Sequence, residues 1–235
     1  DPFNRWEAGQ RLALNRMLEA LASLGEPQLD DAFVDAMRGV LRQPQLDPAF
    51  KEVVLTLPSE SNVAERLDHV DPQQVHAVAD AVRRQLAARL HDEWVWAFEA
   101  HQVREGYSAD ATQSGRRALA NLALTHLCLN ASGRPDSPWP GRAYQRFKDA
   151  TNMTDRLGAL GALVDTHAEL AEPALARFHS MFKGDALVID KWFALQARAP
   201  EREGKVFARA KALLKHPDFS IRNPNRARSL IFTLM

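Results

Sequence analysis

The sequence has little that could carry covalent chemistry. Its single cysteine, Cys128, cannot form an intramolecular disulfide, and it lies in the apolar stretch LTHLCLN, where we expect a buried, unreactive thiol. No run of about 18 apolar residues is present, so no membrane span is predicted. The first residues, DPFNRWEAGQ, lack the basic start and apolar run of a signal peptide. We therefore expect a soluble, cytoplasmic protein of a reducing compartment.

Net charge is also absent, because 30 Lys and Arg residues balance 30 Asp and Glu residues. A general polyanion binder needs a basic excess to displace counterions, so nucleic acid is not an expected partner of the chain as a whole. The charges balance over the whole chain but not within each segment. From residue 199 to residue 235 the sequence contains eight basic and three acidic residues.

Catalytic motifs are missing as well. None of the eight histidines forms a His-x-x-x-His pair, and no nucleophile elbow, phosphate loop or dinucleotide fingerprint is present. A lone histidine is then expected to have a surface or structural role. We predict no catalytic residue, no metal ligand and no bound cofactor in this chain.

Helical signals dominate what is there. Apolar residues recur at spacings of three and four, and Asp-Pro or Asn-Pro pairs mark helix starts at Asp1, Asp47, Asp71 and Asn223. The pattern predicts helices near residues 2–24, 29–43, 47–56, 60–68, 71–102, 108–130, 142–150, 154–168, 172–182, 185–198, 202–215 and from 224.

Many medium helices joined by short turns predict an all-α fold, an irregular stack of antiparallel helices of the HEAT/armadillo type with no sheet. We expect one helical-repeat-like domain over 1–235, with the Pro-rich linker 132–141 as its only sub-domain break. The apolar end Leu230–Met235 has no closing signal, so the chain is expected to be truncated within such a stack.

The segment ALVIDKWFALQARA is apolar around most of a helix, so Trp192 and Phe193 are predicted core residues. Asp190 and Lys191 in the same segment must then be paired or lie at an edge.

The last predicted helix has a basic start. Asn223 is placed to cap it and Pro224 to open it, with Arg222, Arg226 and Arg228 close by. Free amides and arginines together favour a carboxylate or phosphate group. A solvated basic face is the alternative.

Five segments in order resemble the C-terminal helical domain of bacterial aminopeptidase N, a family of zinc-dependent aminopeptidases. They are DPFNRWEAGQ, VVLTLPSE, ATNMTDRLGALGAL, LVIDKWFALQA and FSIRNPNRARSLI. The resemblance extends from Asp1 to about Ile231 and is weakest over 131–142. It implies a superhelical stack that closes over a thermolysin-like catalytic domain of the same polypeptide and restricts the access of peptide substrates.

The resemblance also implies that the zinc and the catalytic residues lie in an earlier domain, so that this chain alone is inactive. Within the motif N-P-N-R-x-R, the arginine that faces the substrate channel corresponds to Arg228, and Asn225 and Arg226 belong to the same motif. The alternative is a free-standing helical-repeat scaffold that binds an acidic protein or nucleic acid through its basic end. Neither the residues nor the resemblance fixes the oligomeric state.

Overall fold

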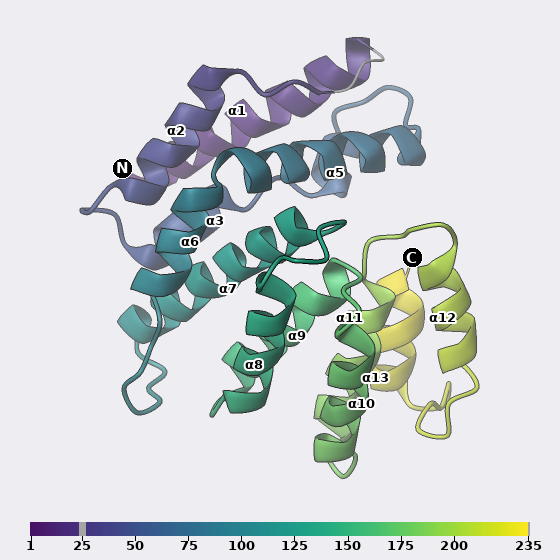
Figure 1. Ribbon diagram of the computed structural model, residues 1–235. Coiled ribbons are helices and arrows are strands. Elements are labelled where there is room, and N and C mark those ends of the chain that lie inside the picture. Colours follow the sequence, from purple (N-terminus) through teal and green to yellow (C-terminus); the bar gives the residue numbers. More distant parts are fainter. Residues whose placement is uncertain (24–26, 235) are drawn as a thin grey trace. The chain divides into compact units, whose positions relative to one another are not determined.

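The computed structural model describes residues 1–23 and 27–234, and over these residues it is built from helices and connecting turns without a strand (Figure 1). The helices run α1 Pro2–Ser23, α2 Asp31–Arg42, α3 Pro48–Leu55, α4 Glu60–Ala64, α5 Pro72–Arg89, α6 His91–Ala100, α7 Ala111–Ala131, α8 Trp139–Asp149, α9 Met153–Asp165, α10 Ala171–Phe182, α11 Ala186–Ala197, α12 Lys205–Leu213 and α13 Pro224–Ala227, followed by the π-helix η1 Arg228–Phe232. The predicted all-α class is confirmed. The predicted end of the first helix at residue 24, and Met235 at the apolar end of the last one, fall outside the described residues.

The predicted Asp-Pro and Asn-Pro starts are confirmed at atomic detail. The Asp47 carboxylate accepts a hydrogen bond from the amide of Ala49 at 2.7 Å, and that of Asp71 accepts one from Gln73 at 2.9 Å. Each pairing satisfies an amide that has no partner within its helix, while the following proline has no amide to satisfy.

The chain forms two compact units, residues 1–130 and 131–235. In the first unit, α1 packs against α3, α4 and α5, and α2 packs against α3 and α6. Side-chain hydrogen bonds connect these helices and their loops. The Gln10 side-chain amide donates to the Thr56 carbonyl at 2.8 Å, and the Gln85 side-chain oxygen accepts from the Leu29 backbone amide at 3.0 Å.

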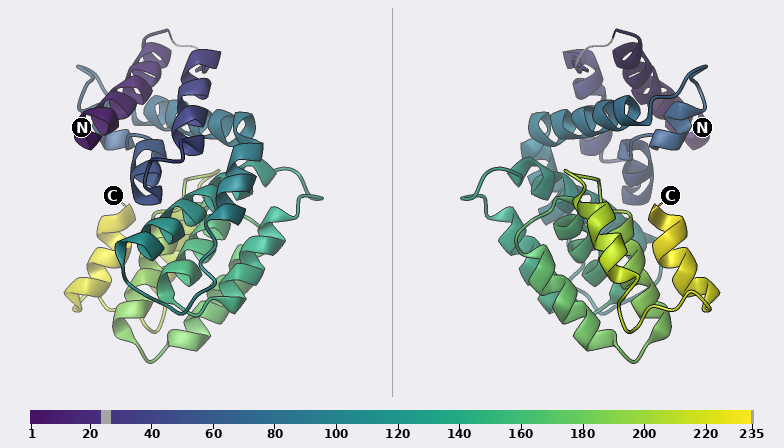
Figure 2. Two further views of the ribbon diagram at one scale, coloured as in Figure 1. Left: turned by 90° about the vertical axis from the view of Figure 1, so that its left-hand side faces the viewer. Right: turned by 90° about the vertical axis from the view of Figure 1, so that its right-hand side faces the viewer.

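The second unit is organised around α11. This helix contacts α9, α10, α12, α13 and η1, and the neighbouring pairs α8–α9 and α10–α11 are visible in both views of Figure 2. Trp192 and Phe193 are buried, as predicted, and the Trp192 indole donates to the Leu175 carbonyl at 3.0 Å. Lys191 lies at an exposed edge and Asp190 is paired with Arg226, so both predicted alternatives for this charged pair occur.

One predicted helix is wrong. The segment 71–102, expected to be a single rod, is two helices that meet at Leu90, whose backbone has φ −112° and ψ 26°. Leu90 is fully buried, and the Leu86 carbonyl at the break accepts hydrogen bonds from both the Leu90 amide and the Trp94 indole. The break is therefore associated with the packing of Leu90 and the hydrogen bond from the Trp94 indole. No Gly or Pro at this point of the sequence indicates it.

The expected buried thiol is confirmed, while one domain over 1–235 with a break at 132–141 stays a prediction. Cys128 is buried, and burial raises the pKa of its thiol to about 12, so the sulfur stays protonated and unreactive. The boundary between the two units at residues 130 and 131 lies next to the Pro-rich stretch 132–141, whose last residues, from Trp139, already belong to α8.

Candidate functional site

The basic end of the second unit begins at Asn223. Its side-chain oxygen accepts hydrogen bonds from the amides of Asn225 at 3.0 Å and Arg226 at 3.3 Å, and Pro224 opens α13. This is the cap that the sequence predicted, and it fixes the direction in which the following arginines leave the helix.

Arg226 points inward. Its side chain is 7% exposed, its Nε donates to an Asp190 carboxylate oxygen at 2.5 Å, and its two terminal nitrogens donate to the carbonyls of Asp218 and Ala186. The guanidinium carbon also lies 4.9 Å from the centre of the Phe193 ring. Arg226 therefore ties α13 to α11 and to the loop before α13, and its donors are committed to that role.

Arg228 and Asn225 are exposed, unlike Arg226. No described residue forms a hydrogen bond or ion pair with the Arg228 guanidinium. At Arg228 the helix widens into the π-helix η1, where the Arg228 carbonyl accepts from both the amide and the hydroxyl of Thr233. Short π-helical turns are rare in proteins, and those that do occur are often found at functional sites. The substrate-facing role predicted for Arg228, Arg226 and Asn225 stays a prediction, and the solvent-facing members are Arg228 and Asn225.

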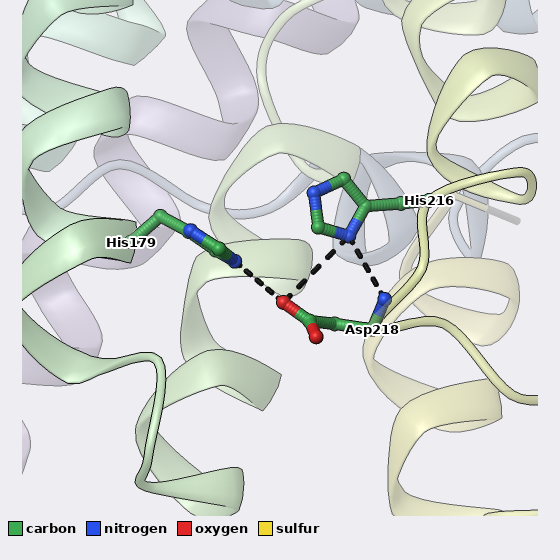
Figure 3. A group of neighbouring side chains, drawn as sticks. All are labelled: His179, His216 and Asp218. Carbon is green, nitrogen blue, oxygen red and sulfur yellow. Dashed lines mark hydrogen bonds and ion pairs between the residues drawn. The ribbon is translucent and has the colours of Figure 1, made fainter.

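A second polar group lies near this end of the chain, and the sequence analysis missed it. His179 on α10, His216 after α12 and Asp218 in the next turn converge on one point (Figure 3). The His179 Nε2 lies 2.5 Å from an Asp218 carboxylate oxygen, and the His216 Nδ1 lies 3.8 Å from the same oxygen. These three residues form what we call the histidine cluster. No sequence spacing could have shown it, because His179 and His216 are 37 positions apart.

The electrostatics of the histidine cluster follow from its contacts. The hydrogen bond from His179 is the main cause that lowers the pKa of the Asp218 carboxyl, which therefore stays ionised. Partial burial lowers the pKa of His216, and nearby Asp218 opposes that shift. The cluster is thus a carboxylate flanked by two imidazoles, a donor set that can hold a divalent transition metal.

The second unit also has a mostly apolar groove of about 700 Å³, lined by residues of α10, α11 and α12 and the end of α9. Arg209 lies along it, with one nitrogen 3.1 Å from the Gln196 side-chain oxygen and another paired with Glu172. Neither Arg228 nor the histidine cluster lines this groove.

The whole chain, residues 1–235, matches the family described as "Domain of unknown function (DUF3458_C) ARM repeats". The chain belongs to this ARM-repeat family. The predicted armadillo-like architecture and the resemblance to the aminopeptidase N helical domain are both confirmed at this level.

Nearly the whole chain is similar in sequence to part of aminopeptidase N from several bacteria. The chain is 37% identical to aminopeptidase N of Caulobacter vibrioides over 233 residues, which cover 99% of the chain and 26% of the relative. It is 34% identical to aminopeptidase N of Escherichia coli over 232 residues, again covering 26% of the relative. A crystal structure of Legionella pneumophila aminopeptidase A in complex with aspartic acid shares the fold, with a TM-score of 0.85, 24% identity and coverage of 100% of the chain and 28% of that protein.

The chain therefore spans about a quarter of the length of the curated relatives it matches. Among the described helices, none combines the length and apolar character needed to cross a lipid bilayer.

Proposed function

We propose that this chain is the C-terminal helical part of a zinc-dependent aminopeptidase, where it encloses the active-site cavity and restricts the access of peptides. The observation that carries the proposal is the match of nearly the whole chain to a quarter of aminopeptidase N at 37% identity. The partner is then the catalytic domain of the same polypeptide, and the substrates are peptides that lose their N-terminal residue. The cytoplasm is the proposed location.

The chemistry of the bond cleavage belongs elsewhere in such a polypeptide. The zinc that the resemblance implies is held by a His-Glu-x-x-His helix, and this chain contains no His-x-x-x-His pair, so its residues do not fit that zinc. What the chain offers instead is a rigid scaffold and an exposed arginine. Arg226, anchored on Asp190, holds the start of α13 in place, and Arg228 is presented in the next turn.

A charged arginine on a fixed scaffold suits the far end of a peptide. Its planar guanidinium pairs with a carboxylate through two hydrogen bonds, and it stays charged at any physiological pH. We therefore propose that Arg228 binds the C-terminal carboxylate of a short peptide substrate.

The first prediction concerns the isolated 235-residue chain. We expect no hydrolysis of aminoacyl amides or short peptides, with or without added zinc, because the family's zinc ligands and general base are missing. The measurement is amine release against time at several chain concentrations. Turnover that scales with the amount of chain and persists through purification would show that a catalytic centre lies here after all.

The second prediction concerns Arg228→Ala in the full-length polypeptide. We expect kcat/KM for short peptides to fall about tenfold, which is about 1.4 kcal/mol of lost transition-state stabilisation, mainly through KM. Aminoacyl amides have no downstream carboxylate and should change much less. The size is at the low end for a charged hydrogen bond because the side chain is exposed to water.

Arg222→Ala is the matched control, because Arg222 is also exposed and lies just before the Asn223 cap. It should leave both substrate classes unchanged. Equal losses for peptides and amides in Arg228→Ala would remove the carboxylate role from Arg228 and leave it a structural residue.

A further inference from the structure

The histidine cluster brings together three potential metal-ligand atoms from separate elements. The atoms are Nε2 of His179, Nδ1 of His216 and a carboxylate oxygen of Asp218, and all lie within 4.8 Å of one another. His179 comes from the last turn of α10, and the other two come from the loop that joins α12 to α13. In Figure 3 both imidazole edges are directed toward the Asp218 carboxylate.

The spacing is close to what a metal ion requires. Zinc bonds to His nitrogen and carboxylate oxygen are about 2.0–2.2 Å, which places tetrahedral ligands about 3.3–3.5 Å apart. In the structure the two nitrogen-to-oxygen distances are 2.5 Å and 3.8 Å, one shorter and one longer than that value. Side-chain adjustments of about 1 Å therefore convert the cluster into a coordination site.

The rings are already held by their neighbours. The Trp192 ring lies 5.0 Å from the His179 ring and 5.2 Å from the His216 ring, and Phe193 meets His216 edge-on at 5.7 Å. Trp192 and Phe193 are buried on α11, so this aromatic wall is part of the core. Ligands oriented in this way lose little side-chain freedom when they bind an ion.

The histidine cluster is accessible to solvent. The three side chains are 25%, 26% and 38% exposed, so water can reach the cluster and complete the coordination. Binding replaces the His179–Asp218 hydrogen bond and the bond from the Asp218 amide to the His216 Nδ1 at 3.1 Å. Because Asp218 is exposed, a water molecule can accept the hydrogen bond of its backbone amide in place of His216. Arg226, bonded to the Asp218 carbonyl, adds a positive charge nearby and limits the affinity.

We propose that His179, His216 and Asp218 form a binding site for a divalent transition-metal ion, zinc above all, with a water molecule as the fourth ligand. The ion would join the end of α10 to the loop that leads into α13, and so would fix the loop whose carbonyl anchors Arg226. Two imidazoles and one carboxylate with an open position form a donor set typical of zinc. The site is built entirely from this chain, so its test does not depend on aminopeptidase activity.

The experiment is a titration of the metal-free 235-residue chain with Zn²⁺ by calorimetry and with Co²⁺ by absorbance and tryptophan fluorescence. We expect one ion per chain with a dissociation constant of about 1–10 μM, because the site has three protein ligands and a nearby guanidinium. Bound Co²⁺ should give visible absorption bands of a four-coordinate ion and quench the fluorescence of Trp192. At 100 times the dissociation constant, Zn²⁺ should raise Tm by about 5 °C.

The variants His179→Gln and Asp218→Asn should each weaken binding by more than about 100-fold, since even partners behind the ligands of a metal site typically contribute 10- to 100-fold. His76→Gln is the matched control. His76 forms a 2.8 Å pair with Glu60 on the first unit, and within the described residues it belongs to no group of three potential ligands, so its loss should leave binding unchanged.

Absence of saturable binding in a folded wild-type chain, or equal affinity in wild type and Asp218→Asn, overturns the site. Equal weakening by His76→Gln would place the ion elsewhere and also overturn it. If the 235-residue chain does not keep its fold alone, metal content is compared in the longer polypeptide that contains it. There the wild type must hold one more ion per chain than Asp218→Asn, and equal contents reject the proposal.

Discussion

Arg226→Ala is expected to lower the free energy of unfolding by about 3–5 kcal/mol, the usual cost of removing one partner from a buried ion pair. The change leaves the Asp190 carboxylate, 14% exposed, without its cation. It also deprives the carbonyls of Asp218 and Ala186 of their donors. The measurement is urea unfolding followed by circular dichroism and tryptophan fluorescence.

The matched control is Arg228→Ala, two positions away on the same segment. Its side chain is exposed and unpaired within the described residues, so the free energy of unfolding should change by no more than about 0.5 kcal/mol. The double variant Arg226→Met with Asp190→Leu should recover the part of the loss that comes from the unpaired Asp190 carboxylate, because it replaces both charges with apolar groups of similar size. The carbonyls of Asp218 and Ala186 still lack donors in this variant, so the recovery should be incomplete. A loss below about 1 kcal/mol for Arg226→Ala would mean that water solvates Asp190 in its place.

Arg226 and Arg228 show which structural features a local sequence motif predicts and which it does not. The sequence fixes their spacing in N-P-N-R-x-R, and the cap at Asn223 was predictable because capping depends on three or four consecutive residues. Which arginine turns inward depends on the position of Asp190, 36 residues earlier on α11. That is a tertiary contact, and no local pattern carries it.

The same division applies to the fold. The helical class and most helix starts could be read from periodicity and from Asp-Pro pairs, because both act within one turn. The break at Leu90 could not, because a buried leucine and an indole donor at Trp94 replace the usual Gly or Pro signal. The histidine cluster was invisible for a related reason, since its members meet only after α10 and the α12–α13 loop have packed on α11.

The general expectation of a satisfied structural role for each histidine is also incomplete for His126. This residue of α7 is buried, stacks on Trp94 with ring centres 4.2 Å apart and planes 7° apart, and its Nδ1 has no hydrogen-bond partner among the described residues. Loss of hydration lowers the pKa of His126 to about 3, and the Arg83 cation nearby adds to the shift. The folded chain therefore holds this imidazole neutral.

His126 should make the protein sensitive to acid. Its pKa is about 3 in the folded chain and 6.5 in the unfolded chain, so between these values only the unfolded chain binds the proton. The free energy of unfolding is then unaffected above pH 6.5 and falls by about 1.4 kcal/mol per pH unit below it, or about 3 kcal/mol at pH 4. The measurement is urea unfolding at pH 7, 6, 5 and 4 for wild type and His126→Phe.

The variant His126→Phe keeps a ring against Trp94 and cannot titrate, so its loss between pH 7 and pH 4 should be about 3 kcal/mol smaller than that of wild type. At pH 7 it should be as stable as wild type or slightly more so, because it removes a buried nitrogen without a partner. Exposed His69, changed to Gln, is the control and should leave the pH dependence unaltered. Carboxylates titrate in all three proteins and cancel in the difference. Parallel stability curves for wild type and His126→Phe would contradict this prediction. They would mean that the imidazole, although buried and stacked on Trp94, accepts a proton at no cost in stability.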